Sequence, residues 1–221
     1  MVAGVAVAGA QEAGAPKCPL ETGRTYQYQF TLSGKPIGKF TFTCAAEAGA
    51  LMKVTSHMDL SPEGFRQVLD STLTVGQDMR PQRSEIKGQA GDTGYQYTCV
   101  YEGGRVQVKG VAGGVPMSVT VDLPPDWEAF DNNALADISL LAARVGLQPQ
   151  AVKSLACFNA ASCRVLHCTP DLREGEELAV GDRKYQTVRC EVKELKTTLW
   201  LAPTGLLIKG EQGPVVFALL P

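Results

Sequence analysis

The sequence predicts a mainly β protein of the α+β class: a curved antiparallel sheet or half-barrel of about ten or more strands, with one amphipathic helix near residues 132–146. Three observations lead to this fold. Polar and apolar side chains alternate along most of the chain, which is typical of half-buried strands. Short turns containing glycine or proline separate these runs. A single interval in the second half changes to helical spacing.

The first two strands form a hairpin with one polar and one apolar face. Tyr26, Tyr28 and Phe30 alternate with polar residues, and after a short turn Phe40 and Phe42 do the same. A helix would scatter these aromatic side chains around its axis, whereas a strand collects them on one side. The pattern therefore predicts an antiparallel hairpin whose apolar face contributes to a core.

The same alternation continues as a meander through the first half of the chain and resumes after the helix. The charged run at 173–177 lies between two of the later strands and is interpreted as a solvated turn. Further strands are expected before the helix at 51–60, 65–75, 83–87, 95–101, 105–109 and 117–123, and after it at 151–158, 163–169, 185–194, 197–201, 206–211 and 215–220.

The interval between the two sets of strands predicts the helix. Asp131 or Asn132 supplies an N-terminal cap, apolar residues recur at helical spacing over 135–145, and Gly146 provides a stop. An amphipathic helix must bury its apolar stripe, and the apolar face of the sheet is the natural partner.

Composition narrows the function classes. The chain has 221 residues, of which 44% are hydrophobic and 20% charged, as expected for a chain that buries a core. Its 21 lysines and arginines and 23 acidic residues give a net charge of −2. A nucleic-acid binder needs a cationic excess, and no run reaches the roughly 18 apolar residues of a membrane-spanning helix. We expect neither a nucleic-acid partner nor a transmembrane segment.

Residues 1–17 are interpreted as the remnant of a signal peptide or as a flexible tail. The segment 2–10 resembles the apolar part of a secretory signal, and Ala8-Gly9-Ala10 offers the small residues that a signal peptidase accepts, but a basic stretch before it is missing. With the β-rich fold, this predicts export to the bacterial periplasm or cell envelope. Residues 18–221 are expected to form a single β-rich domain.

A helix across a curved sheet encloses an interior that is either a packed core or a lipophilic pocket. The side chains expected to line it come from strands on both sides of the helix. Under the pocket interpretation they bind a hydrophobic or lipid-like ligand, and under the other they only fill the core. The candidate ligand-binding residues are Tyr26, Tyr28, Phe30, Phe40, Phe42, Tyr97, Tyr101, Val119, Val188 and Trp200.

The order of elements, together with several short motifs, resembles a known group. The motifs are Tyr26-x-Tyr28-x-Phe30, Gly34-x-x-Ile37-Gly38, the run 80–85, the run 180–187 and, most specifically, Trp200-Leu201-Ala202-Pro203-Thr204-Gly205. Over most of residues 20–221 the chain is similar to bacterial exported proteins of unknown function whose fold is like that of the outer-membrane lipoprotein carriers. The resemblance implies a half-barrel covered by helices, and it implies no catalytic residue.

Cysteines and a histidine cluster late in the chain. Seven cysteines are an odd number, so at least one thiol is unpaired within the monomer. In an oxidising compartment we expect one disulfide among Cys157, Cys163 and Cys168, with the pairing left open. A zinc site is disfavoured, because a strand would direct Cys163 and His167 to one face and Cys168 to the other. No metal or cofactor is expected.

Three hypotheses follow. The first is a non-enzymatic exported domain that binds a hydrophobic or lipid-like ligand in the concavity of the sheet. The second is a structural or protein-interaction module with a filled core. The third is an enzyme or metal site that uses the Cys/His cluster at 157–168, which requires a reactive thiol of low pKa at Cys163 or Cys168. No catalytic residue is assigned, because the two histidines, His57 and His167, lie in expected strands without a recognisable nucleophile motif.

Overall fold

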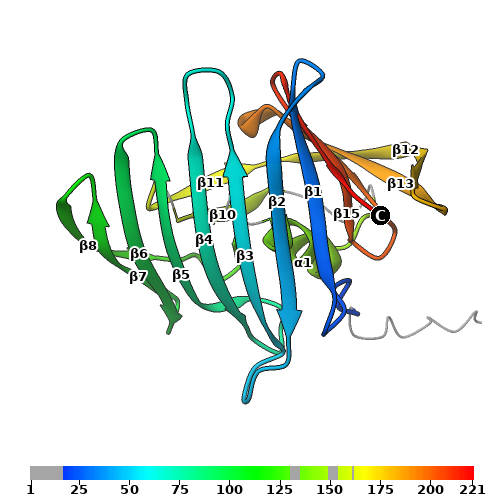
Figure 1. Ribbon diagram of the computed structural model, residues 1–221. Helices are drawn as coiled ribbons and strands as arrows, with labels where there is room; N and C mark the ends of the chain where they lie inside the picture. The colour runs from blue at the N-terminus through cyan, green and yellow to red at the C-terminus, as the bar shows by residue number, and fades with distance from the viewer. Residues whose placement is uncertain (1–16, 130–134, 149–153, 161) are drawn as a thin grey trace, which may run out of the picture.

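The computed structural model describes residues 17–129, 135–148, 154–160 and 162–221. Within them, thirteen strands form one antiparallel sheet and three form a second, smaller sheet (Figure 1). Residues 1–16 of the tail predicted at 1–17 lie outside the described residues. The large sheet runs in the order β12 (Pro170–Val180), β13 (Arg183–Val192), β14 (Thr197–Leu201), β15 (Leu207–Gln212), β16 (Val215–Leu219), β1 (Thr25–Leu32), β2 (Lys35–Ala45), β3 (Met52–Leu60), β4 (Gln67–Val75), β5 (Pro81–Ala90), β6 (Thr93–Glu102), β7 (Arg105–Ala112) and β8 (Val115–Asp122).

Almost every pairing in the large sheet joins strands that follow one another along the chain, as the turn residues predict. The exception is β1 beside β16, which brings the N- and C-terminal parts together, with Phe30 opposite Phe217. The order ends at β12 on one side and β8 on the other, so the sheet is open. The mainly β class and the curved antiparallel sheet are confirmed.

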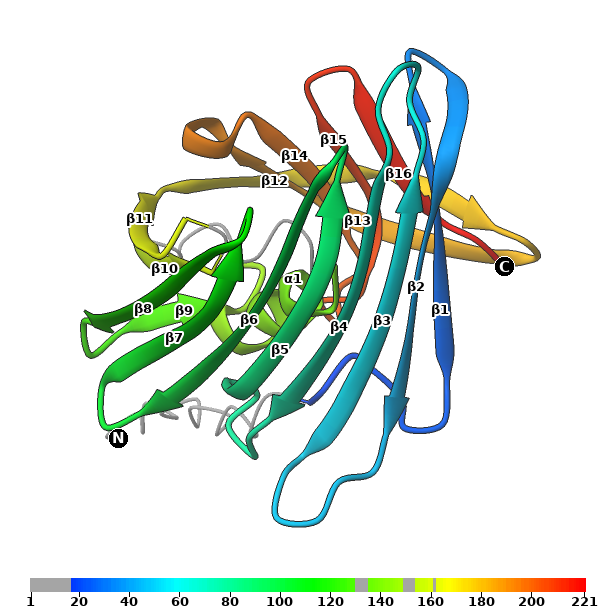
Figure 2. The ribbon, with the colours of Figure 1, turned by 60° about the vertical axis from the view of Figure 1, so that its left-hand side comes forward.

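The smaller sheet and the helix lie inside the curve of the large sheet. The smaller sheet contains β9 (Trp127–Ala129), β10 (Leu155–Asn159) and β11 (Arg164–Cys168), with β9 parallel to β10. Figure 2 shows the large sheet bending around the helix α1 (Leu135–Val145), with β1–β8 on one side and β12–β14 on the other. The concave side therefore holds the core.

The helix confirms the interval predicted from periodicity, although residues 130–134, which include the expected caps, lie outside the described residues. Two contacts attach it to the sheet. The Ser139 hydroxyl accepts a hydrogen bond from the Leu207 backbone N–H at 3.0 Å. Gly205 approaches the helix so closely that a Cβ there would lie 2.7 Å from the Ala143 nitrogen. Glycine at this position permits the contact between helix and sheet.

Buried charges also position the helix. Arg144 of α1 forms an ion pair with Glu128 of β9, and it donates a hydrogen bond to the Met79 carbonyl at 3.0 Å. Arg80 lies 3.6 Å from the other carboxylate oxygen of Glu128. Burial, together with the neighbouring charge of Arg80, lowers the pKa of Arg144 to about 10. This still leaves Arg144 protonated at neutral pH, so the ion pair connects α1 to the smaller sheet.

The turn predicted at 173–177 is wrong, since these residues lie within β12. The strand pairs with β13 on both sides of an irregularity between Glu174 and Glu177. β12 is an edge strand, so acidic side chains there remain in water while the backbone pairs on one side only. The short 3-10 turn at Lys193–Leu195 then connects β13 to β14.

Candidate functional site

The predicted ligand-binding residues are spread over the concave side of the sheet. Strand pairing places Tyr28 opposite Phe40 and Tyr26 opposite Phe42. Most of the ten residues belong to the core or pack against it, whereas Val119 shares a face with the buried Val108 but is itself exposed. The core members are Tyr26, Tyr28, Phe30, Phe40, Phe42 and Tyr97, and the residues packed against them include Tyr101 and Val188.

Trp200 is the exception, and the prediction that it faces the concavity is wrong. It lies opposite Arg189 on one neighbouring strand and Lys209 on the other, both on the convex side. The Lys209 ammonium lies 4.3 Å from the centre of the Trp200 ring, a cation–π contact. Trp200 therefore lies outside the concavity, against Lys209, while Leu199 and Leu201 on either side of it belong to the core.

The aromatic residues of the first hairpin pack against one another. The Tyr26 and Phe42 rings stack with centroids 4.9 Å apart, and the Tyr28 hydroxyl donates a hydrogen bond to the Leu207 carbonyl at 2.8 Å. Burial raises the pKa of Tyr28 far above its usual value, so the hydroxyl stays protonated. In this part of the concave side, the aromatic side chains belong to the packed core.

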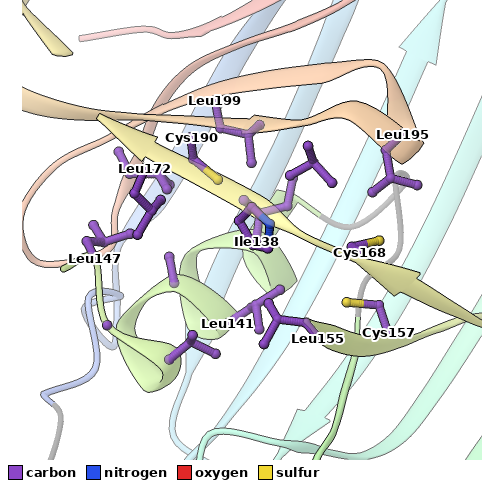
Figure 3. Close-up of a pocket in the computed structure, with 16 residues that line it drawn as sticks. Ile138, Leu141, Leu147, Leu155, Cys157, Cys168, Leu172, Cys190, Leu195 and Leu199 are labelled. Carbon is purple, nitrogen blue, oxygen red and sulfur yellow. The ribbon is translucent and has the colours of Figure 1, made fainter. Parts of the chain in front are cut away.

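A cavity of about 60 Å³ lies elsewhere on the concave side, between α1, β10 and β12–β14. Figure 3 shows Leu141 and Leu155 on one side of this cavity, with Cys190 and Leu199 on the other. None of the ten predicted residues lines it. Sequence reasoning missed it because its walls meet only when the helix contacts strands that follow it by up to about 60 residues.

The cavity runs from the surface toward the core. Leu147 and Leu155 at one part of its lining are half-buried, and Leu172 and Leu201 at another part are buried. All the described residues that line it are aliphatic, glycine, proline or cysteine. Apart from the weakly polar thiols, the lining offers no hydrogen-bonding group, so it selects a ligand by its hydrocarbon content.

The size of the cavity limits what fits. Typical small-molecule sites enclose about 300–1,000 Å³, several times the volume here. An apolar lining gives water no strong hydrogen-bond partner and favours apolar groups. A volume of about 60 Å³ admits no more than the end of one hydrocarbon chain.

Three cysteines contribute to the lining: Cys157, Cys168 and Cys190. All seven cysteines of the chain lie in the described residues, and all are free thiols. Burial raises the pKa of Cys190 to about 12, so it remains a protonated thiol. Cys163 is not at the cavity; it lies in a turn with φ +53°, and its thiol donates a hydrogen bond to the Ala160 carbonyl at 3.5 Å.

Neither histidine lines the cavity to which the three cysteine thiols contribute. His57 is on the convex face, where its Nδ1 lies 2.7 Å from Asp70, with both side chains exposed. His167 is an exposed residue of β11, next to the buried Cys168. Among the described residues, no group of three His, Cys, Asp or Glu side chains is arranged to hold a metal ion.

Comparison with known proteins identifies no family. No protein-family model matches the chain, and no curated protein matches it. Among solved structures, a DUF1089 family protein from Pseudomonas aeruginosa aligns with 76% of this chain and 87% of its own, at 13% identity and a TM-score of 0.47. In the described part of the chain, no helix is long and apolar enough to span a bilayer. The similarity to lipoprotein carriers stays a prediction.

Proposed function

We propose that the protein binds the hydrocarbon part of a lipid-like ligand on the concave side of its sheet, without catalysing a reaction on it. The cavity between α1, β10 and β12–β14, lined only by apolar groups, carries this proposal. The proposal includes export to the bacterial periplasm or cell envelope, which is supported by the signal-like sequence at 2–10. In that setting the ligand would be a membrane-derived lipid or fatty acid.

Energetics favour occupation of the cavity. A chain end that enters it would gain about 0.8 kcal/mol for each methylene removed from water. The affinity would depend on chain length, because the headgroup meets no complementary polar group in the cavity.

A cavity-filling variant tests the proposal. Ala142 is buried in the wall of the cavity, so Ala142→Leu would place three more carbon atoms in the free space. We expect wild type to bind decanoate saturably with one site per chain, as measured by isothermal titration calorimetry. The Ala142→Leu variant should lose this binding and keep or increase its thermal midpoint, because it exchanges a void for buried hydrocarbon.

The matched control is Ala179→Leu, which adds the same atoms at an exposed position of β12. This variant should bind decanoate like wild type. If wild type does not bind decanoate, or if a folded Ala142→Leu binds it equally well, the proposed site is wrong. Native mass spectrometry of the protein from its own host would then identify any ligand that co-purifies.

A further inference from the structure

Two of the cysteines in the cavity wall are neighbours on adjacent strands. Strand pairing places Leu155 of β10 opposite Cys168 of β11, and Cys157 opposite Leu166. Cys157 and Cys168 are therefore diagonal neighbours, and because side chains two positions apart share a face, both point to the same side of the smaller sheet. They are close in space although ten residues lie between them in the sequence.

The two side chains line the same cavity, and each residue is 2% exposed. Figure 3 shows the two side chains one above the other at the same end of the cavity. Cys163, the third cysteine of the cluster, bonds instead to the Ala160 carbonyl in the turn before β11. Geometry thus selects one pair from the three that the sequence allows.

The proximity of the two thiols makes the sulfurs chemically different. Cys168 and burial raise the pKa of Cys157, which keeps its proton. Cys157 lowers the pKa of Cys168, because a neighbouring thiol stabilises the thiolate form of Cys168. A thiolate is the nucleophile of thiol–disulfide exchange. Of the two cysteines, Cys168 is therefore suited to react first and Cys157 to complete the bond.

We propose that Cys157 and Cys168 form a reversible disulfide, so that the chain has a reduced and an oxidised form that differ at the wall of the cavity. The oxidant is a disulfide, either a small molecule or a thiol–disulfide oxidoreductase. The Cys168 thiolate attacks one sulfur of that disulfide, forms a mixed disulfide and releases the other sulfur as a thiolate. Cys157 then loses its proton and attacks the Cys168 sulfur, which expels the second thiolate.

The net reaction removes two hydrogen atoms from the protein and reduces the oxidant to two thiols. A disulfide bond is about 2.05 Å long, so the two sulfurs of this diagonal pair must draw closer, which requires the side chains and the backbone of β10 and β11 to shift. This proposal does not depend on ligand binding. It stands or fails separately from the proposed function.

Peptide mapping tests the pairing. The reduced, folded full-length chain is incubated with oxidised glutathione, denatured without reductant, alkylated and digested with trypsin. Cleavage after Lys153, Arg164 and Arg173 places Cys157 and Cys163 in one peptide and Cys168 in the next. We expect a disulfide between the two peptides, with the alkyl group located on Cys163 by fragmentation, and complete reversal by dithiothreitol.

Single variants check the assignment. The Cys163→Ser chain should form the same bond, and Cys157→Ala and Cys168→Ala should not. A bond that contains Cys163 in wild type would overturn the proposal. So would recovery of all three cysteines as alkylated thiols from wild-type protein that kept its circular dichroism spectrum during the incubation. The wild-type map alone decides the matter, which makes the result independent of whether the variants fold.

Discussion

At the scale of single residues, glycines on the concave face allow aromatic rings to lie flat on the sheet. Tyr95 lies opposite Gly88, and Phe217 lies opposite Gly210. A Cβ on Gly210 would come within 2.2 Å of the Phe217 ring. The alternation of polar and apolar residues predicts which face is buried, but it does not reveal these pairs, because the register between strands decides which ring covers which glycine.

We therefore expect Gly210→Ala to destabilise the protein. The methyl group would force the Phe217 ring away from the sheet and from its stacked partner Phe30, whose centroid is 5.2 Å distant. Overpacking of this kind costs about 1–3 kcal/mol, which corresponds to a fall of the thermal midpoint by at least about 2 °C. Differential scanning calorimetry measures the change. Gly94→Ala, where a Cβ meets nothing within 4 Å, should leave the midpoint unchanged.

The buried ion pair between Glu128 and Arg144 predicts a larger effect. Glu128→Gln would keep the shape of the side chain but leave the buried guanidinium of Arg144 without a counter-charge, and Arg80 nearby adds repulsion. Breaking a buried pair in this way costs about 3–5 kcal/mol. Urea denaturation would show the loss of unfolding free energy.

An exposed pair supplies the control for that measurement. Arg83 and Glu85 lie 2.8 Å apart on the surface, with about half of each side chain exposed. Exposed pairs contribute about 0–1 kcal/mol, so Glu85→Gln should change the unfolding free energy little. If both variants lose the same amount, burial of the Glu128 pair has no special effect on stability.

At the scale of elements, local pairing was predictable and long-range pairing was not. Hairpins such as β1–β2 follow from alternation around a turn, and α1 follows from its periodicity. The parallel contact between β9 and β10 joins segments on either side of the helix, and three residues of β9 are too few for a pattern to be visible. Leu199, Trp200 and Leu201 are three consecutive apolar residues, and all are buried. Alternation therefore does not show which face of the sheet each one occupies.

The attachment of α1 to β15 depends on a polar contact that periodicity does not reveal. Ser139 is fully buried on the helix, where its hydroxyl accepts the hydrogen bond from the Leu207 N–H. Ser139→Ala would leave that N–H unpaired in the core, at a cost of about 1–3 kcal/mol. We expect faster hydrogen exchange at the Leu207 amide and a lower unfolding free energy. Ser118→Ala, at an exposed position of β8, should change neither.

At the scale of the whole molecule, the concave side has a part that is packed with aromatic side chains and another part that contains the cavity. Curvature brings the aromatic residues of β1 and β2 into the core, and a small apolar cavity lies between α1 and the strands near the β12 edge. An apolar concave face was predictable from composition and alternation. The location of the cavity was not, because it depends on how the helix and the smaller sheet share the space.

The same arrangement connects the two proposals, because the sulfurs of Cys157 and Cys168 lie in the wall of the proposed ligand site. A hydrocarbon chain in the cavity would cover both, so only the empty form would react with oxidised glutathione. The rate of disulfide formation should then fall by the factor 1 + [L]/Kd, about tenfold at a free decanoate concentration ten times its Kd. The rate is followed by quenching with iodoacetamide and counting free thiols by mass.

Cys163 provides the internal control, because it does not line the cavity. Its alkylation rate in the folded protein should be the same with and without decanoate. Saturable decanoate binding that leaves the oxidation rate of the Cys157–Cys168 pair unchanged would mean that the ligand occupies another surface. Slower reaction at Cys163 as well would indicate a general stabilisation of the fold and not coverage of the cavity wall. Only selective protection of the pair is consistent with a hydrocarbon chain between α1 and β12–β14.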